Sequence, residues 1–254
     1  MNNDNHVLGF KTLDNKCKHC YAASFCLSSG LSDTDLSDFD TLVKRRKPLQ
    51  RGERLFYGGD DFRSLYIVHS GSVKTYVESS DGEQQITGFY FPGDLLGFDG
   101  FEKAKHTYSV EALETSSFCE VPARQFEEAA RRIPRLQQQF FRFISTEISR
   151  EQELMLLLGK MTSKRRLASF FINISLCMQK QGYAADSINL TMTRHDIANY
   201  LGLVIETVSR LLTDFHNKGV LKVMRRHIEI KNPRQLISIA NNCAEDEYPL
   251  KDIA

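Results

Sequence analysis

Short apolar segments separated by turn-forming residues fill the chain from about residue 49 to residue 121. Leu65–His69 and Val73–Val77 are two such segments, and pairs such as Ser70-Gly71 and Pro92-Gly93 separate them. A spacing of about 10 residues between the segments predicts short antiparallel strands of a sandwich or barrel. Asp81-Gly82 lies between two alternating segments and therefore predicts a β-hairpin.

After Pro134 the pattern becomes helical, and no Gly or Pro interrupts it before residue 159. Five apolar residues follow at steps of 3, 4, 7 and 3 positions: Phe141, Ile144, Ile148, Met155 and Leu158. This spacing is typical of a two-helix interface, so it predicts a dimerisation helix. Glu151 lies in the gap, where it faces its own copy in a parallel dimer. Two such charges about 5 Å apart repel by roughly 3 kcal/mol at an effective dielectric constant of about 20. The alternative is a helix that packs on its own domain with Glu151 in water.

The pattern near the C-terminus predicts a winged helix-turn-helix. Thr193 is a suitable N-cap for a helix over Arg194–Tyr200, with Asp196 at its third position. A turn containing glycine then leads to a second helix over Ile205–Asn217. Two strand-like runs follow, Val220–Val223 and His227–Ile230, with basic residues between them. Helix, turn, helix and basic hairpin in this order are typical of a winged helix-turn-helix.

In that motif the N-terminal residues of the second helix enter the DNA major groove. Here these residues are Ile205, Glu206, Thr207, Ser209 and Arg210. Glu206 can accept a hydrogen bond from cytosine, and Arg210 can donate two to guanine. Because the two residues are four apart, the alternative is an exposed ion pair on one helix face. We favour DNA reading, since the turn and the basic hairpin occur beside this helix.

Composition adds a charge asymmetry and excludes some classes of protein. The 254 residues are 41% hydrophobic and carry a net charge of +1, which is ordinary for one or two globular domains. Residues 159–234, however, hold 13 Lys and Arg against 5 Asp and Glu, which favours a polyanionic partner. The sequence contains no apolar run of about 18 residues, so no membrane span is expected. It contains no secretory signal peptide, so a cytoplasmic location is expected.

Three cysteines lie within ten residues near the N-terminus, at Cys17, Cys20 and Cys26. In a reducing compartment such a C-x2-C-x5-C group favours a metal site over disulfides. Tetrahedral zinc and a four-iron cluster both require a fourth ligand. The candidates are His19, Cys119, Cys177 and Cys243. The spacing alone does not separate zinc from iron–sulfur.

These motifs together resemble those of one known family. They are the C-x2-C-x5-C group, residues 84–89 (QQITGF), residues 111–115 (EALET), residues 190–194 (LTMTR) and residues 200–210 (YLGLVIETVSR). The chain resembles the fumarate and nitrate reduction regulator, the oxygen-sensing branch of the cyclic-AMP-receptor superfamily, from about Cys17 to Ile239. The resemblance implies an α+β fold with an N-terminal double-stranded antiparallel β-roll, a long dimerisation helix and a C-terminal winged helix-turn-helix. The implied parts are a cysteine-rich segment (1–30), a β-roll sensor (31–133), the dimerisation helix (134–160), a DNA-binding domain (161–239) and an acidic tail (240–254).

The resemblance also implies a function and its residues. A [4Fe-4S] cluster would be held by Cys17, Cys20, Cys26 and Cys119, and oxygen would convert and then remove it. The cluster-loaded dimer would bind double-stranded DNA at palindromic TTGAT-like half-sites through Glu206, Ser209 and Arg210, supported by Thr193 and Thr207. Ile148 matches a position that shields the seam acid, here Glu151. Loops at Ser70-Gly71 and Ser80–Gly82 would contact RNA polymerase.

Some residues differ from those of relatives that bind cyclic nucleotides, and others differ from those of the best-studied members of the family. Residues 106–109 precede Val110-Glu111-Ala112 and contain no arginine, so a cyclic phosphate would lack its bidentate partner. No cyclic nucleotide is therefore expected. Ile205 replaces a base-reading arginine of the cyclic-nucleotide branch. Tyr21 and Phe25 are bulkier than the residues of the best-studied members, which would slow oxygen access to the sulfur ligands.

Other functions fit parts of the sequence. A zinc-stabilised winged-helix factor shares every feature except the resemblance, and metal content separates the two. A regulator that responds to a small molecule without a cluster would leave the four cysteines unexplained. An iron–sulfur redox protein would need a second cofactor site, and no glycine-rich nucleotide motif follows a strand. No arrangement of catalytic residues stands out, so the protein is not expected to be an enzyme.

Overall fold

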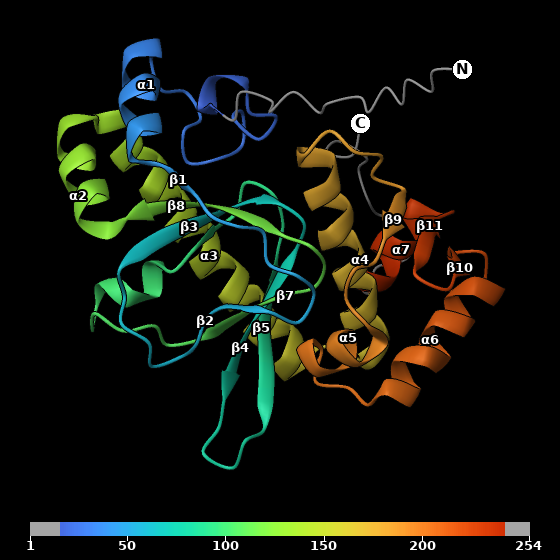
Figure 1. The fold of residues 1–254 in the computed structure, drawn as a ribbon. Helices are drawn as coiled ribbons and strands as arrows, with labels where there is room; N and C mark the ends of the chain where they lie inside the picture. Colours follow the sequence, from blue (N-terminus) through green and yellow to red (C-terminus); the bar gives the residue numbers. More distant parts are fainter. Residues whose placement is uncertain (1–15, 242–254) are drawn as a thin grey trace, which may run out of the picture.

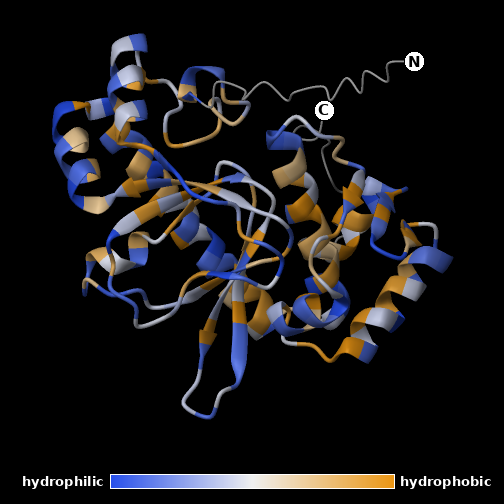
Figure 2. Ribbon diagram, viewed as in Figure 1, coloured by the Kyte–Doolittle hydropathy of each residue, from blue (hydrophilic) through white to orange (hydrophobic). Residues whose placement is uncertain are grey.

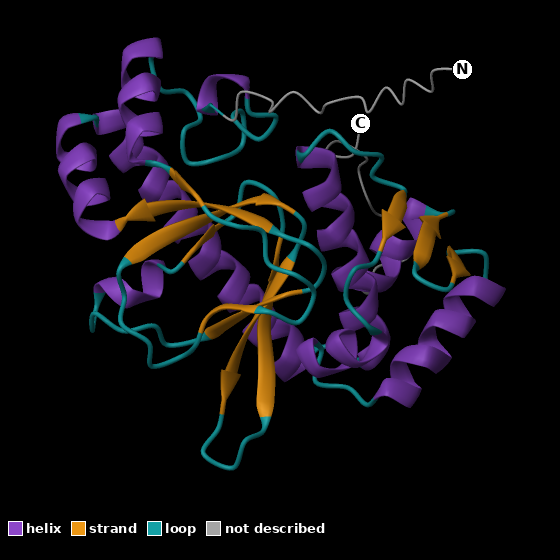
Figure 3. Ribbon diagram, in the orientation of Figure 1, coloured by secondary structure: helices purple, strands orange, loops and turns teal. Residues whose placement is uncertain are grey.

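The computed structural model describes residues 16–241 (Figure 1). Most of the expected acidic tail, Cys243 and the first half of the cysteine-rich segment lie outside these residues. An antiparallel β-roll comes first, a long helix follows, and a small helical domain with a three-stranded sheet ends the described chain. Figure 3 shows this mixture of helices and sheets, which confirms the α+β fold class.

Two antiparallel four-stranded sheets form the β-roll, with strand orders β1-β8-β3-β6 and β2-β7-β4-β5. The strands are β1 (Lys44–Arg45), β2 (Arg54–Phe56), β3 (Ser64–Ser70), β4 (Val73–Glu78), β5 (Gln84–Tyr90), β6 (Leu95–Leu96), β7 (Ser109–Ala112) and β8 (Ser117–Pro122). β4 and β5 pair antiparallel around Asp81-Gly82, so the predicted hairpin is confirmed. Buried and more exposed side chains alternate along the second half of β5, whereas the first five residues of β3 are all buried. Val68, Val73 and Val110 are fully enclosed between the sheets.

Helices cover one end and one side of the β-roll. They are η1 (Cys17–His19), α1 (Asp33–Leu42), η2 (Phe98–Phe101), α2 (Ala123–Arg132) and α3 (Pro134–Lys160). α3 has the bounds predicted for the dimerisation helix and begins with a proline, which suits a first helical turn. α1 and α2 lie side by side at the end of the β-roll that carries the cysteine-rich loop (Figure 1).

The C-terminal domain contains α4 (Ser163–Lys180), β9 (Ser187–Asn189), α5 (Arg194–Tyr200), α6 (Ile205–Asn217), β10 (Leu221–Met224), β11 (His227–Ile230) and α7 (Pro233–Asn241). Both helices of the predicted motif have the expected bounds, and the capping box at Thr193 and Asp196 is present. β9 was not predicted, because a three-residue strand with one buried side chain, Ile188, has no readable period.

The buried apolar residues form a separate core in each region, and Figure 2 shows apolar segments along the inner faces of the elements. One core fills the winged-helix domain, one lies between the sheets, and one lies under α1 and α2. No helix within residues 16–241 is both long enough and apolar enough to cross a membrane.

Candidate functional site

The structure brings four cysteines into one region. Cys17 begins η1, and Cys26 lies in the irregular chain after it; residues 17–26 are called the cysteine loop below. Cys17, Cys26 and Cys119, which lies on β8, are buried in the core under α1 and α2, and Cys20 packs against this core. About 90 residues separate Cys119 from the others, and the β-roll brings it to them. Cys177 lies elsewhere, on α4.

Contacts from α1 and β1 position this loop. The amide of Cys17 donates to Asp40 Oδ1 at 2.9 Å, and Arg45 Nη2 lies 3.8 Å from Cys17 Sγ. In the β1–β8 ladder, the backbone of Arg45 lies opposite the backbone of Cys119. The guanidinium group of Arg45 therefore lies beside Cys17 and close enough to Cys119 for its charge to act on that thiol. The sequence pattern did not indicate Asp40 or Arg45, because both act through tertiary contacts.

The cysteines are free thiols in a poorly hydrated region. Burial raises the pKa of Cys17 and the pKa of Cys119 to about 12, and it raises the pKa of Cys26 as well. Among residues 16–241, no three His, Cys, Asp or Glu side chains converge closely enough to hold a single metal ion. A four-iron cluster binds each cysteine at a different corner, so its ligands need not converge on one point. Four sulfur donors in one buried region fit such a group.

Aromatic side chains cover the cysteine loop. The Phe25 ring packs so closely on Gly93 that a Cβ atom added there would overlap Phe25 Cδ2. Tyr21 donates a hydrogen bond to the His69 carbonyl oxygen, and its ring contacts those of Phe25 and His69 edge to face. The two bulky residues noted in the sequence thus anchor the loop to the β-roll.

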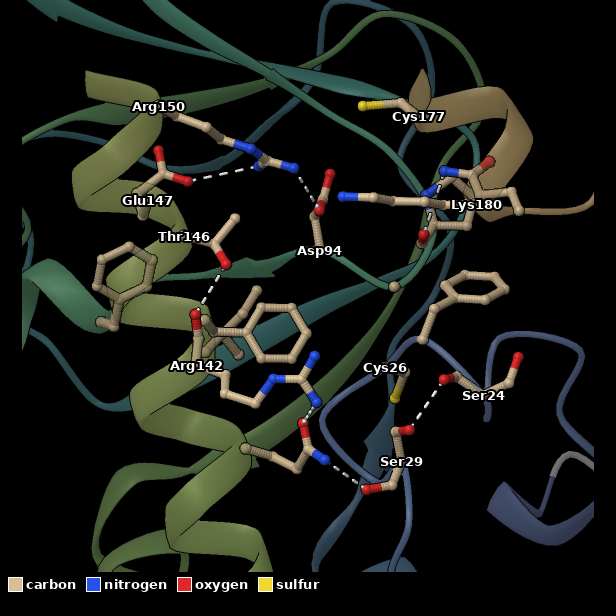
Figure 4. Close-up of a pocket in the computed structure, with 18 residues that line it drawn as sticks. Ser24, Cys26, Ser29, Asp94, Arg142, Thr146, Glu147, Arg150, Cys177 and Lys180 are labelled. Carbon is tan, nitrogen blue, oxygen red and sulfur yellow. Dashed lines mark hydrogen bonds and ion pairs between the residues drawn. The ribbon is translucent and has the colours of Figure 1, made fainter. Parts of the chain in front are cut away.

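A cavity of about 250 Å³ lies beside this loop, between α3 and α4 (Figure 4). Cys26 from the cysteine loop and Cys177 from α4 both line it. Within it, Arg150 binds Asp94 Oδ1 at 3.3 Å and Glu147 Oε2 at 3.5 Å. Tyr90 donates to the other Glu147 oxygen. This polar contact joins the turn before β6, which holds Gly93, to α3.

A neighbouring face of α3 is apolar and exposed. Phe141 is 57%, Ile148 49% and Met155 74% exposed, and Glu151 is exposed among them. Ile144 is half-buried, and Leu158 packs partly on the winged-helix core. Large apolar side chains exposed along one stripe indicate a face that another surface covers.

α6 presents the predicted DNA-reading residues to solvent. Glu206 and Arg210 are exposed, while Val208 and Leu212 are buried in the domain core. Thr207 and Ser209 are half-buried, and Arg194 donates to Ser209 Oγ at 3.3 Å. Glu206 is exposed enough to contact base edges. In the described part of the chain it forms no ion pair with Arg210, which was the alternative for these two residues.

Residues 106 and 107, which precede Val110 and include no arginine, contact a buried acid. Asp99 accepts hydrogen bonds from the Thr107 hydroxyl at 3.0 Å and the Thr107 amide at 2.5 Å, and it contacts His106 at 3.3 Å. Burial raises the pKa of Asp99, but the hydrogen bonds from His106 and Thr107 outweigh it and leave the pKa lowered. A carboxylate at this place repels a phosphate.

A polar contact that the sequence did not reveal joins the β-roll to the winged-helix domain. Lys74 on β4 donates to Asp196 Oδ1 on α5 at 2.9 Å and lies 3.2 Å from Glu111 Oε1. Nearby, Asn199 on α5 accepts from the Ile86 amide at 2.6 Å and donates to the Gln84 carbonyl at 2.6 Å. The β4–β5 hairpin thus holds the first helix of the DNA-binding motif.

Similarity to known proteins agrees with this architecture. Residues 46–132 match the cyclic nucleotide-binding domain family, and residues 165–239 match the Crp-like helix-turn-helix domain family. A β-roll joined by a long helix to such a domain defines a DNA-binding transcription regulator. The anaerobic regulatory protein of Aggregatibacter actinomycetemcomitans is 42% identical over 224 residues, 88% of this chain and 87% of that protein. The chain belongs to the Crp/Fnr family of transcription regulators, in its branch of fumarate and nitrate reduction regulators.

Other relatives are consistent with this assignment. The transcriptional activator protein Anr of Pseudomonas protegens is 42% identical over 90% of this chain and 94% of its own length. The fumarate and nitrate reduction regulatory protein of Yersinia pestis is 40% identical over 89% and 90%. The structure of FixK2 from Bradyrhizobium japonicum superposes with a TM-score of 0.70 at 30% identity, covering 78% of this chain and 96% of that one. These relatives are transcription regulators and not enzymes, and regulators of this family bind DNA as dimers.

Proposed function

We propose that this regulator responds to oxygen through a [4Fe-4S] cluster held by Cys17, Cys20, Cys26 and Cys119. The observation that carries the proposal is the burial of Cys119 in the same core as the loop cysteines. Arg45 adds a positive charge beside Cys17 and near Cys119, which offsets the negative charge of bound thiolates. When bound, such a cluster supplies reactivity toward oxygen, which destroys it.

The chain itself converts the state of the cysteine loop into dimerisation. The ordered loop packs through Phe25 on Gly93, and Asp94 next to it binds Arg150 on α3. This contact fixes the helix face that carries Ile148 and Met155. Burying the exposed side chains of Phe141, Ile148 and Met155 there stabilises a dimer by a few kcal/mol, while the Glu151 pair opposes it by about 3 kcal/mol. The two effects nearly balance, so a small bias from the loop suffices to shift the equilibrium.

The dimer then binds palindromic TTGAT-like DNA sites in the cytoplasm. Glu206 and Arg210 read base edges, Ser209 and Thr207 contact the site beside them, and Thr193 caps the supporting helix. Two copies of α6 related by two-fold symmetry fix the spacing of the half-sites at about one helical turn. Loops at Ser70-Gly71 and Ser80–Gly82 contact RNA polymerase.

Metal analysis of protein purified without oxygen tests the proposal. We expect about four irons and four acid-labile sulfides per chain, and an absorption band that changes in air. Cys119→Ser should lose the iron, whereas Cys177→Ser, the control on α4, should keep it. Zinc in place of iron would support the zinc-stabilised factor and contradict the oxygen response. Iron that survives Cys119→Ser would exclude Cys119 as a ligand.

A further inference from the structure

The hairpin of β10 and β11 is the wing of this domain, and the two-residue turn at its tip consists of two arginines. Met224 pairs with His227 across β10 and β11, so Arg225 and Arg226 alone form the connection. Arg225 has a φ of +56°, in the left-handed region that glycine occupies without strain. A side chain there costs about 1–2 kcal/mol. An arginine at a position suited to glycine indicates a use for its side chain.

The wing has more positive charge than its own acids neutralise. Glu229 on β11 binds Lys222 at 3.5 Å and Lys231 at 2.5 Å. Arg225 and Arg226 are exposed, and no acidic side chain of residues 16–241 forms an ion pair with either. Both guanidinium groups are therefore available to a polyanion.

The wing lies at the end of the exposed stripe of α6. Glu206, Arg210, Thr213 and His216 lie along that stripe and are all exposed. His216 Nδ1 accepts a hydrogen bond from the Val223 amide of β10 at 3.2 Å, which ties the stripe to the wing. Figure 1 shows β10 beside the C-terminal end of α6. Glu206 and His216 are ten residues apart, about 15 Å along the helix.

We propose that Arg225 and Arg226 enter the minor groove beside each half-site and extend the sequence preference to flanking A·T pairs. With the N-terminal part of α6 in the major groove, the wing stands over the next stretch of duplex. A·T-rich DNA has a narrow minor groove with a strongly negative potential, which attracts inserted arginines. The inference rests on the DNA binding of the proposed function and adds a second reading surface to it.

Fluorescence anisotropy with the full-length protein, without oxygen, tests this surface. Two duplexes carry the same half-sites with either A·T or G·C flanks. We expect wild-type protein to bind the A·T-flanked duplex about 10-fold more tightly. Arg225→Gly should remove this preference and keep or raise the melting temperature, since glycine relieves the left-handed strain. Arg226→Gln should weaken the preference. Arg234→Gln, which removes the same charge from α7, should leave it unchanged.

Several results would overturn the inference. These are equal wild-type affinity for both duplexes, a preference that survives Arg225→Gly, or loss of the preference in Arg234→Gln. A third duplex with scrambled half-sites keeps the proposed function separate. If wild-type protein binds it as tightly as the intact sites, specific DNA reading by α6 fails. If only the flank effect is missing, the wing inference fails alone.

Discussion

Asp196 has two roles, because its two carboxylate oxygens bind different parts of the chain. Oδ2 accepts the Thr193 amide at 2.8 Å and completes the cap of α5, while Oδ1 accepts Lys74 from the β-roll. Burial raises the pKa of Asp196, but the hydrogen bonds from Thr193 and Lys74 outweigh it and lower the pKa. A lowered pKa in the folded state adds stability above the unfolded pKa of about 4, and this stability is lost as the pH falls.

Lys74→Met should therefore destabilise the protein in a pH-dependent way. Without Lys74, the carboxylates of Asp196 and Glu111 face each other with little water between them. We expect a loss of about 2 kcal/mol at pH 7, less than for a fully buried pair because Lys74 keeps some contact with water. The difference from wild type should narrow below about pH 4, as both acids take up protons.

Urea denaturation at pH 7 and at about pH 3, below the unfolded pKa of both acids, measures this difference. Lys218→Met is the control, since Lys218 pairs with Asp214 at 2.8 Å on the exposed surface of α6. It should change stability much less at either pH. Equal effects of the two substitutions would show that the Lys74 contact does not join the domains.

At the scale of elements, α3 has two faces with opposite chemistry. Glu147 and Arg150 face the β-roll and bind its polar groups, whereas Ile148 and Met155 face solvent. Burial raises the pKa of Glu147, in spite of the hydrogen bond from Tyr90 and the nearby Arg150. The inner face fixes how the helix sits on its own chain. The outer face decides whether a second chain binds.

Glu151→Ala should make the protein dimeric in air. Removing one charge from each copy removes a repulsion of about 3 kcal/mol, which corresponds to roughly 100-fold tighter association. Sedimentation velocity of the aerobic protein measures the change, and binding to the half-site duplex should rise with it. Glu153→Ala, two residues along and off the seam, should have little effect. An aerobic Glu151→Ala protein that stays monomeric would contradict the seam.

At the scale of the whole molecule, local sequence patterns predicted the helices but not the side-chain contacts between distant parts of the chain. The bounds of α3, α5 and α6 followed from periodicity and caps, which depend on near neighbours in sequence. The contacts Lys74–Asp196 and Arg45–Cys17 join residues that are 122 and 28 positions apart, and no short-range pattern marks them. Cys119 as fourth ligand came only from the family resemblance, because spacing left four candidates open.

The connection between the cysteine loop and the β-roll rests on Gly93. It has a φ of +92°, and a Cβ atom there would meet the Phe25 ring, one residue before Cys26. Gly93→Ala therefore combines a conformational cost of about 1–2 kcal/mol with overpacking that costs about 1–3 kcal/mol. We expect a displaced loop, a lower melting temperature and less iron per chain after anaerobic purification.

Gly59→Ala separates the two costs. Gly59 has nearly the same φ, +94°, but nothing lies within 4 Å of an added Cβ atom. The Gly59→Ala protein should lose only the stability that corresponds to the conformational cost, about 1–2 kcal/mol, and it should keep its iron. The rate at which a thiol reagent labels Cys26 in the iron-free protein provides a readout independent of the cluster, and it should rise in Gly93→Ala alone. Equal labelling rates and equal iron contents in both variants would mean that Phe25 does not hold the loop on the β-roll. The series of contacts from the cysteines through Asp94 to α3 would then lack its first contact.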